Sequence, residues 1–324
     1  MQDDTTSADA GTLADIERAA GCKAESVVRD SEGDILALSF EACNLETLPE
    51  AVSRLVHLQD LQLKGNYISS LPESLASLEY LEELNLAHNR LEMLPPWIGG
   101  FSRLRILNLW GNRLSSVPDS VGALSQLEDL ALHGNRLEKL PDSIWNLRSL
   151  DSLQLGGNRL VQISPQIADL SELTYLDLSH NLLTSLPPEL AGLRHLSHLR
   201  VGGNSFSAPP GVIGGLSGLK GLHLAECNLK RTPDWLWNLA DLEMLHLGDN
   251  HLSDLPGDIR LLTKIQTLHL DGNRLVRLPR ELADLPQLKR ITLTRMPTLL
   301  DPPHDIVDRG TSAVLDHLRS HGRG

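Results

Sequence analysis

Residues 81–103 read LEELNLAHNRLEMLPPWIGGFSR, and this pattern recurs along most of the chain. Seven apolar positions recur in the repeat, and in this copy they hold Leu81, Leu84, Leu86, Leu91, Leu94, Ile98 and Phe101. Across the first eleven copies, only Pro209 and Thr232 replace an aliphatic residue or phenylalanine at these positions. The copies follow one another every 23 residues without insertion, and they begin at Ile35, Leu58, Leu81, Leu104, Leu127, Leu150, Leu173, Leu196, Leu219, Leu242, Ile265 and Leu288. The chain is therefore predicted to be an array of one repeated unit.

The spacing within one unit predicts its local structure. Leu84 and Leu86 are two residues apart, so they lie on one face of a short strand. The later apolar positions are three or four residues apart, which favours a turn followed by a short helical return. A proline such as Pro95 follows the position of Leu94 in most units, and we expect it in the first turn of that return. Because one unit cannot bury its apolar side alone, the units should stack into a parallel sheet with helical segments opposite.

The unit LxxLxxLxLxxNxLxxLPxxIxxL resembles the leucine-rich repeat of the 23-residue class. It is similar to the repeats of Ras-scaffold proteins, plant intracellular Ras-group-related proteins, the Scribble and Erbin group, and bacterial Roco proteins. The resemblance implies an α/β fold: a leucine-rich repeat solenoid, or horseshoe, with a parallel inner sheet, short helical segments on the convex side and a cap at each end. It also implies protein–protein recognition on the concave sheet.

A second resemblance concerns the C-terminal region. Residues 302–307 (PPHDIV), followed by Gly310 and Thr311 and then a helix, resemble the segment that closes the repeats in bacterial Roco proteins. In that family the segment precedes a Ras-like GTPase domain. This chain contains no Gly-x-x-x-x-Gly-Lys-Ser/Thr loop, so we expect no GTPase activity from it.

The repeat pattern divides the chain into three parts. Residues 1–34 are predicted to form an N-terminal cap, with a short helix over 12–20 and a hairpin that turns at residues 31–33. Residues 35–301 hold about twelve repeats. Residues 302–324 are predicted to form a C-terminal capping helix over the last unit.

One polar position recurs inside the apolar pattern. A buried amide there can satisfy backbone groups of its own unit and of its neighbour, so we expect a structural asparagine ladder. Cys43, Cys227 and Met296 replace asparagine in three units, and we interpret the two cysteines as buried structural thiols. Together with Cys22 they are too few and too scattered for a disulfide framework. The ladder consists of Asn66, Asn89, Asn112, Asn135, Asn158, Asn181, Asn204, Asn250 and Asn273.

The residues that alternate with the strand leucines should form the exposed sheet face, where we expect a partner to bind. Trp110 is a large ring that the core does not need, and such residues commonly anchor interfaces. The alternative is a solitary exposed ring on a monomer. The predicted partner-binding residues are Ile106, Trp110, His133, Tyr175, His198, Arg200, His223, His246, His269 and Asp271.

Three of these residues allow a second interpretation. His223, His246 and His269 fall on successive strands about 4.8 Å apart, so neighbouring imidazoles could share a metal ion. The favoured alternative is a polar face that titrates near pH 6.5 and binds no metal. A row of arginines after the asparagine ladder (Arg90, Arg113, Arg136 and Arg159) is interpreted as a solvated edge.

The composition of the chain narrows the range of functions that it could have. Lys plus Arg number 29 against 42 for Asp plus Glu, and the net charge of −13 disfavours a nucleic-acid partner. The acidic start Met1-Gln2-Asp3-Asp4 does not resemble a signal peptide, and no apolar run predicts a membrane helix. No catalytic motif occurs, so we expect no enzyme activity, cofactor or metal.

These features predict a cytoplasmic, non-enzymatic scaffold that binds protein partners in intracellular signalling. A small GTPase or another signalling protein is a possible partner, and no membrane is involved. The first alternative is a regulatory or sensory module that acts with a Ras-like or Roco-type GTPase. The second is the metal site on the histidine row.

Overall fold

The computed structural model describes residues 8–321, and its chain divides into two compact units, Met1–Leu160 and Val161–Gly324. Residues 1–7 of the expected N-terminal cap and residues 322–324 of the expected C-terminal helix lie outside the described part of the chain. We describe each unit by itself.

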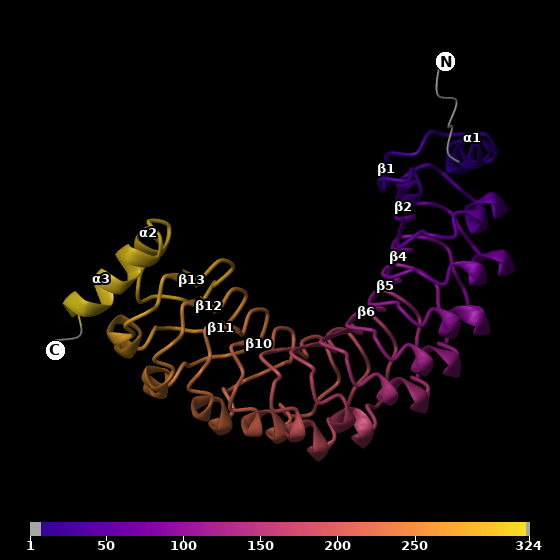
Figure 1. Cartoon of the computed structure of the whole chain (residues 1–324). Coiled ribbons are helices and arrows are strands. Elements are labelled where there is room, and N and C mark those ends of the chain that lie inside the picture. The colour runs from indigo at the N-terminus through magenta and orange to yellow at the C-terminus, as the bar shows by residue number, and fades with distance from the viewer. Residues whose placement is uncertain (1–7, 322–324) are drawn as a thin grey trace. The chain divides into compact units, whose positions relative to one another are not determined.

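The first unit begins with helix α1 (Ala8–Ala20), which starts four residues before the expected Thr12. A hairpin follows, in which β1 (Ser26–Arg29) pairs antiparallel with β2 (Ile35–Ser39). Five further strands then add in parallel (Figure 1). Each residue in them pairs with the equivalent residue of the preceding repeat. They are β3 (Asp60–Gln62), β4 (Glu83–Asn85), β5 (Ile106–Asn108), β6 (Asp129–Ala131) and β7 (Ser152–Gln154).

The second unit continues the same arrangement with six parallel strands and two helices. The strands are β8 (Tyr175–Asp177), β9 (His198–Arg200), β10 (Gly221–His223), β11 (Met244–His246), β12 (Thr267–His269) and β13 (Arg290–Thr292). Beyond β13, where one capping helix is expected, the chain forms α2 (His304–Val307) and α3 (Thr311–His321). Gly310, with a φ of +89°, separates them.

In the first eleven repeats the return segment is a five-residue 3₁₀ helix. In the first unit these are η1 (Glu50–Arg54), η2 (Glu73–Ser77), η3 (Pro96–Gly100), η4 (Asp119–Ala123) and η5 (Asp142–Asn146). In the second they are η6 (Pro165–Asp169), η7 (Pro188–Gly192), η8 (Gly211–Gly215), η9 (Asp234–Asn238), η10 (Gly257–Leu261) and η11 (Arg280–Asp284).

The recurring proline therefore has a different place from the one expected. Pro95 is extended (φ −70°, ψ 146°) and lies just before η3, as the equivalent proline does in most repeats. The expectation that it occupies the first helical turn is wrong for these repeats. A proline is well suited to this boundary, because its fixed φ holds the extended geometry and its missing N–H removes one unsatisfied donor.

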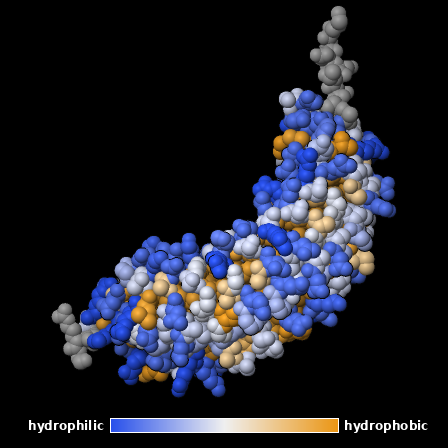
Figure 2. Space-filling model, turned by 60° about the horizontal axis from the view of Figure 1, so that its bottom comes forward, coloured by the Kyte–Doolittle hydropathy of each residue, from blue (hydrophilic) through white to orange (hydrophobic). Residues whose placement is uncertain are grey.

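The core of each unit lies between the strands and the 3₁₀ helices. Leu84 on β4, Leu86 just after that strand and Ile98 on η3 are fully buried, as are most of their equivalents. Each such burial contributes roughly 1.5–3 kcal/mol to folding. At the position where Pro209 replaces leucine, the helical side of the second unit instead holds a groove of about 690 Å³ lined by η7 and η8. Figure 2 shows that hydrophobic residues reach the surface on the helical side only in small separate groups.

The nine asparagines of the ladder are buried, and their side chains link neighbouring repeats. Asn135 Oδ1 accepts the N–H of Leu114 (3.0 Å), and its Nδ2 donates to the carbonyl oxygens of Leu109 (3.0 Å) and Leu132 (2.9 Å). The bonds of Asn204 follow the same pattern in the second unit. One amide thus satisfies donors and acceptors of two successive loops, which water cannot reach.

Candidate protein-binding surface

The strand centres, such as Leu107 and Leu245, are buried, so the flanking residues of each strand form its solvent-facing side. The ten residues predicted to bind a partner fall in both units. Ile106, Trp110 and His133 belong to the first, and the second holds Tyr175, His198, Arg200, His223, His246, His269 and Asp271. They form two separate groups, and we treat the two surfaces independently.

In the first unit Trp110 lies between two imidazoles of neighbouring repeats. Its ring centroid is 4.0 Å from that of His88 and 4.7 Å from that of His133, which stacks on it at 25°. Trp110 keeps 37% of its surface exposed. We call His88, Trp110 and His133 the tryptophan cluster.

The backbone around the tryptophan cluster explains its geometry. Asn108 Oδ1 accepts the N–H of Trp110 (3.1 Å), which fixes the turn after β5. Gly134 leaves room for the indole, since a Cβ there would lie 3.3 Å from Trp110 Cδ1. His88 adopts a left-handed φ of 53°, where the neighbouring repeats have Gly65 and Gly111. Five other repeats also have a left-handed non-glycine residue at this position, such as His180 (φ 51°), so the turn itself requires this conformation, and a side chain there costs roughly 1–2 kcal/mol.

Acidic side chains flank Ile106, which lies four residues before Trp110. The register places Glu83 on β4 and Asp129 on β6 on either side of Ile106. Burial raises the pKa of Glu83, and the neighbouring Asp60 raises it further. Burial also raises the pKa of Asp129, although Ser152 and Gln154 oppose this by hydrogen bonding. This side of β4–β6 therefore combines an exposed ring with partly desolvated carboxylates.

In the second unit His223, His246 and His269 stack on β10, β11 and β12, and we call them the imidazole row. The ring centroids are 4.2 Å apart between His223 and His246 and 4.8 Å apart between His246 and His269. Burial lowers the pKa of all three, and mutual repulsion adds to the effect for His223 and His246. For His223 the pKa falls to about 3. The expectation that this row titrates near pH 6.5 is therefore wrong.

Hydrogen bonds assign the neutral forms of two of these rings. The Gly248 N–H donates to His246 Nδ1 (3.2 Å), so His246 carries its proton on Nε2. His269 Nδ1 lies 3.0 Å from Thr292 Oγ1, and that hydroxyl donates to Asp271, so His269 donates through Nδ1. His223 Nδ1 is buried and has no hydrogen-bond partner within residues 8–321. Because the rings are stacked, their lone pairs point side by side and do not converge on one point. The described part of the chain holds no group of three His, Cys, Asp or Glu side chains that could bind a metal ion.

Charged groups lie at both ends of the imidazole row. At the β9 end, Arg200 approaches Asp177 at 3.9 Å. Burial lowers the pKa of Arg200, but the hydrogen bond with Tyr175 and the charge of Asp177 outweigh it and raise the pKa. At the β12 end, burial raises the pKa of Asp271, but hydrogen bonds from Thr292 and Thr294 lower it below its ordinary range. The row therefore has a fixed cation at one end and a fixed anion at the other.

Sequence reasoning missed His88, because it is not among the residues that alternate with the strand leucines. A usable signal was present: His88 occupies a position that is glycine in several other repeats. Asp177 and Thr292 are among the residues that alternate with the strand leucines. The sequence does not predict that Asp177 pairs with Arg200 or that Thr292 contacts His269. Those pairings depend on rotamers that the repeat pattern does not specify.

Comparison with known proteins agrees with this architecture. A family model described as leucine-rich repeat matches residues 38–91, 102–160 and 150–206. A leucine-rich repeat protein of Leptospira interrogans has a similar structure, with a TM-score of 0.73 and 34% identity over 78% of this chain and 64% of that one. The fold is that of leucine-rich repeat structures, and the predicted fold class is confirmed. No curated protein sequence matches it.

Two further structures are similar over much of this chain. The plant peptide hormone receptor RGFR1, solved with RGF2, has a TM-score of 0.60 and 26% identity over 76% of this chain and 45% of that one. An internalin of Listeria monocytogenes has a TM-score of 0.65 and 20% identity over 90% and 94%, which shows the fold alone. The chain thus spans 64% of the Leptospira protein and under half of the plant receptor.

No helix among the described residues is long and apolar enough to cross a membrane.

Proposed function

We propose that this chain is a non-enzymatic interaction module whose protein partner binds the exposed sheet face of the first unit, centred on Trp110. Leucine-rich repeat proteins in general mediate protein–protein interaction, and the fold is typically a scaffold. The observation that carries the proposal is the tryptophan cluster. An exposed indole is held between two imidazoles, at positions that hold small residues in several other repeats.

The energetics favour Trp110 as an anchor. Its ring is already immobilised by His88 and His133, so docking costs little additional side-chain entropy. Glu83 and Asp129, which flank Ile106 on the same sheet face, favour a partner that has an apolar pocket for the indole and basic groups nearby.

The second unit offers a polar contact surface. Its proposed contact residues are Tyr175, His198, Arg200, His223, His246, His269 and Asp271. Because the imidazole row stays neutral, it contributes hydrogen bonds rather than charge, and Arg200 and Asp271 supply the charges. The similar plant receptor RGFR1 was solved with RGF2, which supports a binding role for a repeat surface of this kind.

We further propose a cytoplasmic role in signalling, on the strength of the family resemblance and the sequence features. A small GTPase is one class of partner that the resemblance suggests. The alternative role, a module that regulates or senses with a Ras-like or Roco-type GTPase, predicts that such a GTPase is captured through the Trp110 face.

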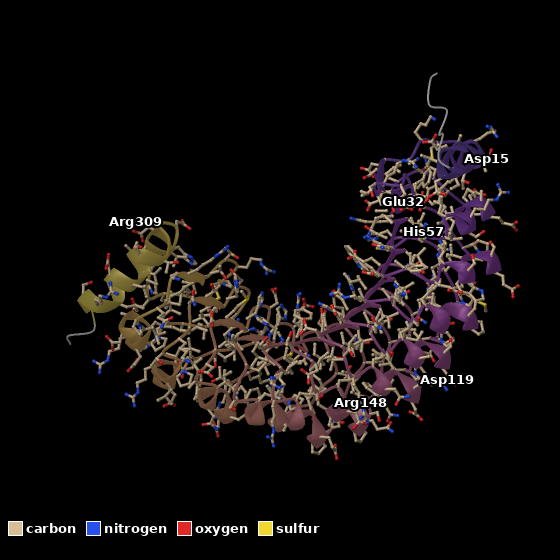
Figure 3. The ribbon with its side chains drawn as sticks, viewed as in Figure 1. Asp15, Glu32, His57, Asp119, Arg148 and Arg309 are labelled. Carbon is tan, nitrogen blue, oxygen red and sulfur yellow. The ribbon has the colours of Figure 1, made fainter. Side chains whose placement is uncertain are left out.

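A quantitative capture experiment tests the proposal. Purified wild-type chain, Trp110→Ala and Asp119→Ala are immobilised, and bound proteins are identified by mass spectrometry and then titrated individually. Asp119 is an exposed residue on the side of the short helices and serves as the control from the same unit (Figure 3). Circular dichroism verifies that both variants are folded.

We expect Trp110→Ala to weaken the partner by at least about 2 kcal/mol, or roughly 30-fold in Kd. Asp119→Ala should bind as the wild type does. If the Asp119 variant loses the partner while Trp110→Ala retains it, the binding surface lies on the helical side and the proposal fails.

A further inference from the structure

The segment after helix α1 is held firmly against the first repeat. Gly21 has a φ of +71° and ends the helix, and Cys22 and Lys23 follow. The ammonium of Lys23 pairs with Glu17, and the Ala24 N–H donates to Glu17 Oε1 (3.2 Å). The Glu25 N–H then donates to the Ser39 carbonyl at the end of β2 (2.9 Å). Cys22 therefore occupies a fixed position beside the loop that follows β2.

Cys43 lies in that loop, at the position that asparagine occupies in most repeats. Its sulfur lies 3.9 Å from the carbonyl oxygen of Lys23, which directly follows Cys22. The thiols of Cys22 and Cys43 share a hydrogen bond. Both residues are partly exposed, whereas Cys227, in the equivalent position of a later repeat, is buried. The fold thus brings together two cysteines that are far apart in the sequence.

We propose that Cys22 and Cys43 form a redox-active dithiol, which a peroxide converts into a disulfide that ties the N-terminal helix to the first repeat. In the first step the Cys22 sulfur attacks hydrogen peroxide, forms a sulfenic acid and releases one water. In the second the Cys43 thiol attacks that sulfur, the S–S bond forms and a second water leaves. Two thiols are oxidised to one disulfide, and one peroxide is reduced to two waters.

The surroundings assign different roles to the two sulfurs. Cys22 lines an open pocket of about 440 Å³ together with Ala14, Glu17, Arg18, Gly21 and Lys23, which gives a small oxidant access. Burial raises the pKa of the Cys43 thiol to about 11, and the hydrogen bond with Cys22 contributes to the rise. Cys43 therefore stays protonated at neutral pH, and a thiol of this kind reacts slowly with peroxide. Cys22 is the sulfur that peroxide oxidises, and Cys43 resolves it.

A disulfide here would restrain the start of the fold. It would close a loop that contains both strands of the β1–β2 hairpin. Strand β1 pairs only with β2 in this unit, and Val28 on it is half exposed, so β1 is held by few buried contacts. Cross-linking its two flanks removes conformational freedom from the unfolded chain and should make the N-terminal region harder to open.

Oxidation of the full-length chain with hydrogen peroxide, followed by alkylation and tryptic mass spectrometry, tests the proposal. We expect residues 19–23 to be linked to residues 30–54 through one disulfide, with one free thiol remaining of the three in the sequence. The melting temperature should rise by roughly 2–5 °C on oxidation and return with dithiothreitol. Cys22→Ser and Cys43→Ser should show neither the link nor the rise.

Cys227→Ser is the matched control, because Cys227 occupies the same repeat position without a thiol neighbour. It should form the link and show the same rise as the wild type. The proposal is overturned if Cys22 accumulates as sulfenic or sulfinic acid without a link, if the link joins two chains, or if it involves Cys227. It is equally overturned if the link forms and the melting temperature does not change.

Discussion

The tryptophan cluster of the first unit and the imidazole row of the second are both sets of rings on successive repeats, yet they differ in chemistry. The indole of Trp110 is exposed and packs between two imidazoles. The rings of His223, His246 and His269 pack on one another and are partly withdrawn from water, so they stay neutral. Stacking alone therefore does not define a binding site, because exposure decides whether a ring can anchor a partner.

The backbone beneath each set of rings differs as well. In the first unit Gly111 and Gly134 have left-handed φ values and leave room for the rings of His88 and Trp110. In the second unit Gly202 leaves room for His223 but also lies against the backbone of the next repeat. An added Cβ would therefore meet mainly side-chain atoms at Gly111 and Gly134, whereas at Gly202 it would meet the backbone of Ala225.

Adding a methyl group to the glycine beneath each set of rings should give the largest difference in the free energy of unfolding. At Gly202 a Cβ would lie 2.4 Å from the carbonyl oxygen of Ala225, so the backbone must shift. We expect Gly202→Ala to lower the free energy of unfolding by about 2–4 kcal/mol. Gly134→Ala meets only the edge of Trp110 at 3.3 Å and a strained φ, and should cost about 1–2 kcal/mol. Urea denaturation of both variants provides the measurement, and equal costs would contradict the distinction.

The second-largest effect should be the dependence of stability on pH, which the imidazole row causes. The pKa of His223 is about 3 in the folded protein and near 6.5 when unfolded. As the pH falls below 6.5, the unfolded chain takes up a proton that the folded chain refuses, so stability is lost. Besides its row, His223 faces Arg200 and His180, whose charges also oppose protonation.

We expect the wild type to lose roughly 1–2 kcal/mol more than His223→Gln between pH 7.5 and pH 5, after allowance for partial exposure. Urea denaturation at the two pH values measures this difference. Parallel losses in both proteins would show that His223 is protonated in the fold. Above about pH 7.5, where the row is neutral in both the folded and the unfolded chain, stability should depend little on it.

Releasing the strain at His88 should have the smallest effect on stability and the opposite sign. Replacing this left-handed residue by glycine removes the backbone cost, so His88→Gly should stabilise the chain by about 0.5–1 kcal/mol. The same change should weaken the captured partner, because Trp110 loses one of the rings that hold it. Thermal unfolding and titration of the partner are the two measurements.

His180→Gly is the matched control for that change, since His180 is also left-handed (φ 51°) and packs over a glycine, Gly203, in the second unit. It should gain similar stability and leave binding through Trp110 unaltered. If His88→Gly binds normally, the imidazole does not position the indole.

Much of the architecture could be predicted from the sequence. A strict period of 23 residues, with leucine two apart and then three or four apart, allows one solution: short parallel strands backed by short returns. The same alternation correctly separates Leu107, which is buried, from Ile106 beside it, which is partly exposed. Asparagine at one recurring position has buried backbone groups to satisfy, and Asn135 bonds to three of them.

Other properties depended on distances that a repeat pattern does not contain. The 3₁₀ form of the returns, the neutrality of His223 and the packing of His88 on Trp110 follow from how closely neighbouring repeats approach. Cys22 precedes the first repeat, so no periodicity relates it to Cys43, and only the docking of the N-terminal segment brings the thiols together. Periodicity determines which face a side chain takes, whereas its contacts, burial and ionisation are set by groups from other parts of the chain that only folding brings near.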